Sequence, residues 1–350
     1  SRIMRPLLFL ALAGAAFGQP NPFTAHDANR DGKVSEAEVP ENLRSHFKVL
    51  DADSDGFLTR EEMSRVAPAA VAATQVDHLT NIDYVGAENP RQTLDLLVPK
   101  DHATRKRPLV VFIHGGAWNS GKKEDGLAVI RALSATGDYV TASLNYRLSQ
   151  EATWPAQIHD CKAAIRFLRG KAAEYGIDAG NIGIMGISAG GHLVSMLGTC
   201  GSNPGMEGDL GAFPRTSSQV QCVVNFFGPT NFLTLSGDSM RPNPVTALLG
   251  GAATGLEERA KDASPVTWVT SKSAPFLTAH GTRDDLVPYS QAEEIHAALV
   301  KAGVESHLIT MQGAGHGFVS DDLNQRIRQF LDNHLRQQNG PISDEPIKVQ

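Results

Sequence analysis

The sequence predicts an α/β domain, with a mostly parallel sheet and helices on both faces, that follows a small α-helical module. Two observations predict this fold class. Short apolar runs rich in β-branched residues alternate with amphipathic stretches of helical length, which is typical of a parallel sheet. An acidic segment with a glycine at its centre precedes these runs and occurs twice. The predicted strands are residues 109–113, 139–144, 182–185, 220–227, 276–278 and 307–309, and two of the predicted helices are residues 158–173 and 290–301.

Composition excludes several classes of protein. The chain has 350 residues, of which 41% are hydrophobic and 20% charged, so it is not globally disordered. Its 32 Lys and Arg against 38 Asp and Glu give a net charge of -6, which disfavours binding to nucleic acid. The longest apolar run, residues 7–17, is shorter than the roughly 20 residues that a membrane-spanning helix needs. We expect neither a nucleic-acid partner nor a membrane span.

The first 18 residues have the pattern of a secretory signal peptide. Arg2 and Arg5 precede the apolar run 7–17, and Ala16-Phe17-Gly18 has the small-x-small pattern that signal peptidase accepts. The alternative is a buried N-terminal helix. We expect export, to the outside of the cell or to the periplasm. The predicted segments are a signal peptide (1–18), a calcium-loop pair (19–66), a linker of small residues (67–77), the α/β domain (78–337) and a polar tail (338–350).

An exported protein meets an oxidising compartment, and the chain has three cysteines, which allow at most one internal disulfide. Cys200 and Cys222 bracket one loop and are the preferred pair. The alternative is that both, together with Cys161, are buried free thiols.

Two segments near the start match the calcium-binding loop of 12 residues. Both carry oxygen-bearing side chains at loop positions 1, 3, 5 and 9, glycine at position 6 and glutamate at position 12. Calcium takes six to eight oxygen ligands, and position 7 contributes only its carbonyl. The predicted ligands of the first loop are Asp27, Asn29, Asp31, Lys33, Ser35 and Glu38. Those of the second are Asp51, Asp53, Asp55, Phe57, Thr59 and Glu62.

The tandem resembles a paired EF-hand. It departs from the family because Pro20 and Pro22 leave barely one turn of helix before the first loop. A dockerin-like repeat that binds a partner protein is therefore a rival interpretation, although both loops end in glutamate. Extracellular calcium is abundant enough to fill even weak sites. We expect a structural ion rather than a switch.

The α/β domain carries a candidate nucleophile. Gly186-Ile187-Ser188-Ala189-Gly190 follows one predicted strand and precedes a helical stretch, which is the context of a nucleophile elbow with Ser188 at its tip. Upstream, His114-Gly115-Gly116-Ala117-Trp118 follows another strand. The backbone N–H groups of Gly116, Ala117 and Ala189 can together receive the negative oxygen of a tetrahedral intermediate. His114 is expected to organise this loop rather than to transfer protons.

A candidate acid and base follow the last two strands. In His280-Gly281-Thr282-Arg283-Asp284-Asp285, Asp284 is the preferred acid and Asp285 the fallback, while His316 lies in a glycine-rich loop 32 residues after Asp284. A histidine there can take the serine proton while its other nitrogen donates to the carboxylate. His192 and His280 also lie near this site, and we expect both to be structural.

The order Ser, Asp, His is that of the α/β-hydrolases, which residues 78 to 337 resemble. Six segments are similar to those of secreted esterases and lipases of the hormone-sensitive-lipase-like, feruloyl and acetylxylan esterase group: HGGAW, Asn145-Tyr146-Arg147-Leu148, GISAGGHL, Phe227-Gly228-Pro229-Thr230, Ala263-Ser264-Pro265 and HGTRDDLVP. Ala117 departs from the third glycine of many members. The resemblance implies a serine carboxylesterase that acts on acetyl, short acyl or feruloyl esters, of small molecules or polysaccharides. It implies no cofactor for the chemistry itself.

Two other functions remain open from the sequence. One is a serine peptidase of the prolyl-oligopeptidase type, although such enzymes usually carry a large partner domain for which 350 residues leave no room. The other is a calcium-dependent binding protein whose hydrolase domain is inactive. Reaction of a serine with a phosphonate separates the active enzymes from this second alternative.

Overall fold

The computed structural model describes residues 27, 29, 31–39, 47, 51, 55–59, 62, 76–201, 203–235, 244–251 and 256–349. The predicted signal peptide and the predicted linker up to residue 75 lie outside the described residues. None of the described helices is both long enough and apolar enough to cross a lipid bilayer.

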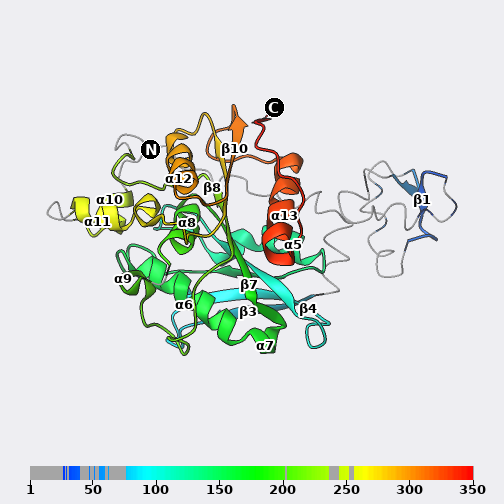
Figure 1. Cartoon of the computed structure of the whole chain (residues 1–350). Helices are drawn as coiled ribbons and strands as arrows, with labels where there is room; N and C mark the ends of the chain where they lie inside the picture. The colour runs from blue at the N-terminus through cyan, green and yellow to red at the C-terminus, as the bar shows by residue number, and fades with distance from the viewer. Residues whose placement is uncertain are drawn as a thin grey trace, which may run out of the picture.

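A sheet of nine strands forms the centre of the domain (Figure 1), in the order β11-β10-β9-β8-β7-β5-β6-β4-β3. The pairs β3–β4 and β4–β6 are antiparallel and the other pairs are parallel. The strands are β3 (Val76–Asp83), β4 (Thr93–Pro99), β5 (Arg107–Ile113), β6 (Val140–Leu144), β7 (Ile177–Ile187), β8 (Cys222–Phe226), β9 (Phe276–Gly281), β10 (Ser306–Gln312) and β11 (Ile347–Lys348). The short strands β1 (Val34–Ser35) and β2 (Phe57–Leu58) form a separate antiparallel pair.

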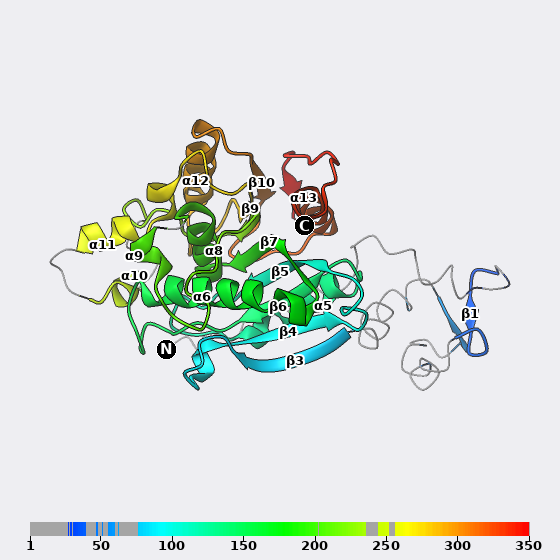
Figure 2. The same cartoon turned by 60° about the horizontal axis from the view of Figure 1, so that its bottom comes forward.

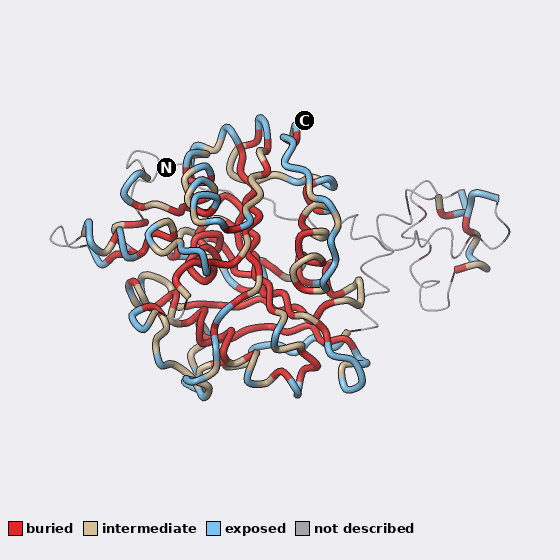
Figure 3. The backbone as a smooth tube through the Cα atoms, in the orientation of Figure 1, coloured by how far each residue is buried: buried red, intermediate tan, exposed pale blue. Residues whose placement is uncertain are grey.

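Helices cover both faces of the sheet, as Figures 1 and 2 show. On one face, α6 (Ala156–Gly170), α8 (Ala189–Thr199) and α12 (Ser290–Lys301) pack on the larger apolar core. On the other, α5 (Leu127–Ser134) and α13 (Asp321–Arg336) pack on the second core. The strands β6, β8 and β9 and the second half of β7 are buried throughout (Figure 3), which explains why they appear in the sequence as apolar runs.

Short helical segments complete the described chain. They are η1 (Pro90–Gln92), η2 (Lys123–Gly126), α7 (Ala172–Tyr175), α9 (Pro204–Glu207), α10 (Pro244–Leu248), α11 (Leu256–Asp262) and η3 (Pro265–Trp268). The last three belong to residues 228–273, and their buried side chains join the core beside α8. Ala263 and Leu248 accept hydrogen bonds from His192 and from the backbone N–H of Trp154, so the described part of this segment is anchored to the domain.

All six predicted strands and both predicted helices are present. The sequence did not reveal β3, β4 and β11. β3 is an edge strand with mostly exposed, polar residues, which lack the apolar pattern of a buried strand. The tail 338–350 was predicted as polar chain without a role, yet β11 returns to the sheet and pairs in parallel with β10.

The predicted disulfide between Cys200 and Cys222 is wrong. All three cysteines are buried free thiols. Cys222 lies on β8 and faces the core under α13, whereas Cys200, at the end of α8, belongs to the core on the opposite face. The sheet therefore separates the two sulfur atoms.

Candidate active site

Ser188 lies at the turn between β7 and α8. Its backbone has φ 53° and ψ -118°, which a non-glycine residue rarely adopts and which lifts the side chain out of the sheet. Gly186 and Gly190 make this turn possible by their lack of a side chain. A Cβ on Gly186 would lie 2.5 Å from the carbonyl oxygen of Gly190, and a Cβ on Gly190 would lie 2.1 Å from the carbonyl oxygen of Ile113.

The loop after β5 passes beside Ser188. A Cβ on Gly115 would lie 3.3 Å from the Cβ of Ser188. Gly116 has φ +107°, and a Cβ there would lie 2.4 Å from the carbonyl oxygen of Ser120, so only glycine fits. Ala117 has φ 52°, a backbone conformation that residues with a side chain rarely adopt. Within the described chain, the backbone N–H groups of Gly116, Ala117 and Ala189 have no protein acceptor, as donors for an oxyanion require.

Neighbouring side chains hold this loop in place. The Nδ1–H of His114 donates to the carbonyl of Gly115 over 2.7 Å, and its ring stacks on Tyr146 with 4.4 Å between centroids. Arg91 donates to the carbonyl oxygens of Gly121 and Tyr146. Burial lowers the pKa of His114 to about 4, so the ring is neutral at pH 7. This agrees with the expectation that His114 organises the loop.

The structure brings Ser188, His316 and Asp284 together. Ser188 Oγ donates to His316 Nε2 over 2.9 Å, and His316 Nδ1 donates to Asp284 Oδ2 over 2.7 Å. The His316 side chain is 13% exposed and the Asp284 carboxylate is fully buried. An imidazole in this position can accept the serine proton while the carboxylate stabilises the resulting positive charge.

Asp284, rather than Asp285, occupies the acid position. Its Oδ1 accepts the backbone N–H groups of Leu286 and Val287, both over 2.9 Å, whereas the neighbouring Asp285 is exposed. Burial raises the pKa of Asp284, but hydrogen bonds from His280 and His316 outweigh burial and hold that pKa well below its usual range. The carboxylate is therefore ionised at neutral pH.

The loops that carry the acid and the base are tied to each other. A Cβ on Gly281 would lie 2.4 Å from the carbonyl oxygens of both Ala314 and Gly315, so glycine at the end of β9 lets the two loops touch. Arg283 N–H donates to the carbonyl of Ala314 over 2.8 Å. The backbone N–H of Gly317 donates back to Gly315, which places His316 at the tip of a tight turn.

His192, Trp118 and Trp154 are buried. The Nε2–H of His192 donates to the carbonyl of Ala263 over 2.7 Å, and its Nδ1 accepts from Trp118 Nε1 over 3.1 Å. Burial lowers the pKa of His192 to about 4. Trp118 is 1% and Trp154 8% exposed, and both belong to the larger apolar core. These contacts indicate structural roles.

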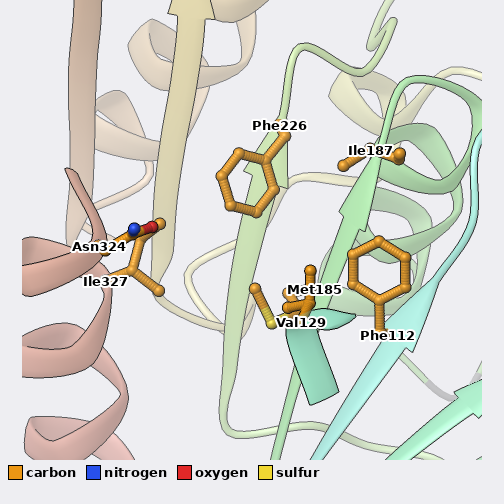
Figure 4. A pocket seen from close by; sticks show the side chains of 7 residues that line it. All are labelled: Phe112, Val129, Met185, Ile187, Phe226, Asn324 and Ile327. Atoms are coloured by element: carbon orange, nitrogen blue, oxygen red, sulfur yellow. The ribbon is translucent and has the colours of Figure 1, made fainter. Parts of the chain in front are cut away.

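A small apolar cavity of about 20 Å³ lies on the face of the sheet that α5 and α13 cover (Figure 4). This volume has room for about one water-sized group. Ser188 does not line it, and its size is that of a packing defect rather than of an acyl pocket. The lining residues are Phe112, Val129, Met185, Ile187, Phe226, Asn324 and Ile327.

The two acidic loops fold as calcium-binding loops do. Gly32 and Gly56 have φ +83° and +85° at the predicted sharp bends. Asp27 accepts the N–H groups of Asp31 and Gly32, and Asp51 does the same for Asp55 and Gly56. Val34 of β1 pairs with Leu58 of β2, which joins the loops.

Hydrogen bonds to the last glutamate close both loops. Ser35 and Thr59 donate their N–H and hydroxyl groups to Glu38 and Glu62 respectively, over 2.7 to 2.9 Å. The donor set is oxygen only, as calcium requires. Asp53 lies outside the described residues, and among those described no group of three His, Cys, Asp or Glu side chains is drawn together as a metal site.

Two residues that contact the triad were given no part in the reaction from the sequence. His280 Nε2 lies 3.1 Å from Asp284 Oδ2. Phe227 has φ 41° and packs its ring against His316, with 4.6 Å between centroids. For His280, the signal available in the sequence was its spacing of four residues from Asp284. Phe227 begins one of the segments that carry the family resemblance, but the sequence assigned it no role, because its contact with His316 depends on the pairing of β8 with β9.

Comparison with family models gives three matches. The BD-FAE model matches residues 94–299, which is more than half of the chain. The model described as TAP-like protein matches residues 256–346, and an EF hand model matches residues 43–67, which contain the second acidic loop.

Named relatives are esterases. Esterase LipC of Mycobacterium tuberculosis is 34% identical over 238 residues, which are 66% of this chain and 58% of LipC. The chain therefore spans little more than half of that relative. It spans 44% of the probable carboxylic ester hydrolase LipM and 53% of esterase LipQ, both of the same organism.

Solved structures agree with the fold. A truncated carbohydrate esterase from gut microbiota has a TM-score of 0.68 and 32% identity, covering 75% of this chain and 98% of its own. An esterase of Thermogutta terrifontis, described as butyrate bound, has a TM-score of 0.59 and 25% identity, covering 75% of this chain and 93% of its own.

Proposed function

The chain belongs to the BD-FAE family of α/β-hydrolases, and we propose on that basis that it hydrolyses carboxylic esters through an acyl-enzyme on Ser188. One observation carries the proposal. The imidazole of His316 lies within hydrogen-bond distance of both the Ser188 hydroxyl and the Asp284 carboxylate. The same geometry argues against an inactive domain that serves only for binding, because such a domain has no need of it.

The proposed reaction has two halves. Ser188 Oγ attacks the ester carbonyl carbon while its proton passes to His316 Nε2, and the carbonyl oxygen becomes negative. The N–H groups of Gly116, Ala117 and Ala189 stabilise that oxygen. The carbon–oxygen bond to the alcohol then breaks, and His316 returns its proton to the leaving alcohol.

Water completes the cycle. His316 removes a proton from a water molecule that attacks the acyl carbon, and Ser188 leaves with that proton. Throughout, Asp284 holds the imidazole in the orientation that points Nε2 at the reacting atoms.

The proposed substrates are esters with a short acyl group, acetyl, feruloyl or a small aliphatic acyl, on an alcohol that can be part of a carbohydrate. The similarity to a protein described as a carbohydrate esterase and to an esterase described as butyrate bound supports this range. Export of the protein stays a proposal that rests on residues 1–18, which lie outside the described residues.

The proposed calcium ions are structural. They would be held by the side-chain oxygens of Asp27, Asn29, Asp31, Ser35 and Glu38 with the Lys33 carbonyl, and by those of Asp51, Asp53, Asp55, Thr59 and Glu62 with the Phe57 carbonyl. The loop geometry and the EF hand match support this role. Bound calcium would supply only ionic cross-linking of each loop. A partner protein that docks on these loops, as a dockerin would, stays an alternative.

A hydrolysis panel tests the proposal. We expect the full chain to cleave nitrophenyl acetate and butyrate, and the panel adds methyl ferulate, acetylated xylan and a peptide anilide. Ser188→Ala should reduce turnover by a factor of about 10⁴ or more. Retained esterase turnover in this variant would refute the nucleophile, and cleavage of the anilide alone would favour a peptidase.

A further inference from the structure

Four N–H groups lie close to the carboxylate of Asp284. Two backbone N–H groups donate to Oδ1, and His316 donates to Oδ2 over 2.7 Å. The fourth belongs to His280, whose Nε2 lies 3.1 Å from Oδ2. An ionised carboxylate has about four acceptor sites, so Oδ2 has room for a second donor beside His316.

The surroundings of His280 determine which of its nitrogens carries the proton. Nε2 lies 2.8 Å from the carbonyl oxygen of Val287 and 3.1 Å from Asp284 Oδ2. Both neighbours can only accept, so Nε2 must be the donor. The Nδ1 atom is buried, and no residue of the described chain offers it a partner.

Thr278 lies two residues before His280 on β9, and Asn225 is paired with Thr278 on β8, so the three residues lie on the same face of the sheet. Thr278 and Asn225 each have a buried polar atom that lacks a partner among the described residues. The ring of His280 is itself fully buried.

Besides Val287 and Asp284, two aromatic rings face His280. The ring of Tyr289, on the chain just before α12, lies 5.8 Å away and its hydroxyl is bonded to Thr310. The ring of Phe227 lies 6.4 Å away and also packs against His316. Asp284 and His316 are thus the ionisable groups through which His280 can act.

We infer that His280 is a positioning residue of the active site, an imidazole whose Nε2–H is shared between the carbonyl oxygen of Val287 and Asp284 Oδ2, the oxygen that also accepts from His316. The inference rests on the proposed esterase activity. His280 fixes the plane of the carboxylate, so that Oδ2 stays aligned with His316 Nδ1. It also withdraws part of the negative charge from His316, which limits how strongly the imidazolium is favoured.

Two substitutions separate the donor from the bulk of the ring. In His280→Gln, the side-chain amide nitrogen can replace Nε2 as donor. In His280→Leu, the volume is largely kept and the donor is lost. The measurement is kcat/KM for nitrophenyl acetate from pH 5 to pH 9, with the thermal unfolding temperature recorded for each protein. His296→Gln serves as the matched control, because His296 lies on α12 and bonds to Ser306 away from the site.

We expect His280→Leu to lose about tenfold in kcat/KM at pH 8, the worth of one hydrogen bond to a charged group. The acid limb of its profile should move to higher pH by roughly 0.5 unit, because the undivided charge of Asp284 then favours the protonated form of His316. His280→Gln should keep most of the kcat/KM and most of the original position of the acid limb. His296→Gln should match the unsubstituted chain in both measurements.

Equal losses in the Gln and Leu variants, or a fall in kcat/KM with an unmoved acid limb, would overturn the inference and leave a packing role. If the unsubstituted chain itself lacked esterase activity, the proposed function would fail instead, so the two failures are distinguishable. A measurement without substitution guards against variants that do not fold. Nitrogen-15 NMR of the full chain should find His280 as the Nε2–H tautomer at pH 7, and the Nδ1–H tautomer would also overturn the inference.

Discussion

Ser188 and Ala117 show that individual residues of the site are held in conformations that their side chains disfavour. Both have φ near +50°. Such strain persists only where the surrounding structure imposes it, and it concentrates at functional sites. Here the close packing of Gly186 and Gly190 imposes it on Ser188.

Asp284 and Asp285 have the same chemistry but different surroundings, so exchanging each for asparagine gives a sharp test. Asp284→Asn should lower kcat by a factor of about 10⁴, because the amide cannot hold the active tautomer of His316. Asp285→Asn, on an exposed residue, is the matched control and should leave kcat within a factor of about two. Steady-state kinetics with nitrophenyl acetate measure both. Equal effects of the two substitutions would contradict the assignment of the acid.

Sequence reasoning identified these residues because their motifs are local. GISAG, HGGA and the two loops after β9 and β10 each carry their signal within a few positions, so the site could be assembled from strand ends alone. The choice between Asp284 and Asp285 was weaker, since it depends on which carboxylate turns inward. The contact of His280 with Asp284 depends on the shape of the loop 281–287, which no pattern of residue types determines.

At the level of elements, the junction of β7 with α8 is the tightest part of the site. The first turn of α8 lies against the carbonyl oxygens of Ile113 and His114, at the end of β5. Three elements, β5, β7 and α8, therefore position the nucleophile and the oxyanion loop together.

A methyl group added at this junction should disrupt it. In Gly190→Ala the Cβ would lie 2.1 Å from the carbonyl oxygen of Ile113, so the backbone must move. We expect a loss of about 2 kcal/mol or more in the free energy of unfolding, together with a large fall in kcat. Urea denaturation and steady-state kinetics measure the two effects. Gly180→Ala is the control, because its Cβ would meet only an Asp178 oxygen at 3.6 Å. Similar behaviour of both variants would contradict the packing argument.

The strands that the sequence did not reveal share a physical cause. The central strands are buried on both faces and form apolar runs, whereas β3 is an exposed edge and β11 has only two residues. Their pairing is decided by neighbouring strands rather than by their own composition. The disulfide was mispredicted for a related reason, since closeness along the chain does not reveal which face of a sheet a side chain occupies.

For the whole molecule, buried neutral histidines should make stability depend on pH. Burial lowers the pKa of His114 and of His192 from 6.5 to about 4. At a pH between these two pKa values, the two histidines are protonated in the unfolded chain but not in the folded chain. The free energy of unfolding therefore falls as the pH is lowered. Each histidine should contribute a slope of about 1.4 kcal/mol per pH unit.

Chemical denaturation at pH 7, 6 and 5 measures this dependence. His192→Gln keeps a donor for Ala263 and should make the slope shallower. The lowered pKa of Asp284 acts in a separate range, because its contribution is present above about pH 4 and is lost as the pH falls further. A free energy of unfolding that stays constant from pH 6.5 to pH 5 would contradict the neutral state of the two histidines.

Calcium removal tests the structural role proposed for the acidic loops. Since a ligand that binds only the folded state stabilises it, EDTA should lower the thermal stability of the full chain more than it lowers turnover. Calorimetry and a nitrophenyl acetate assay on the same samples provide the comparison, and added calcium should reverse the change. Immediate loss of turnover in folded protein would show that the ions have a role in the reaction.

The central claim is that Ser188 becomes covalently bonded to substrate with the help of His316 and Asp284. The most direct measurement is mass spectrometry of peptides after reaction of the full chain with diethyl nitrophenyl phosphate, which leaves a stable phosphoryl group on an activated serine. We predict one adduct, on the peptide that contains Ser188, formed much more slowly in His316→Ala and not at all at that position in Ser188→Ala. An adduct on a different residue, or an equal rate of labelling in the absence of the histidine, would contradict the claim.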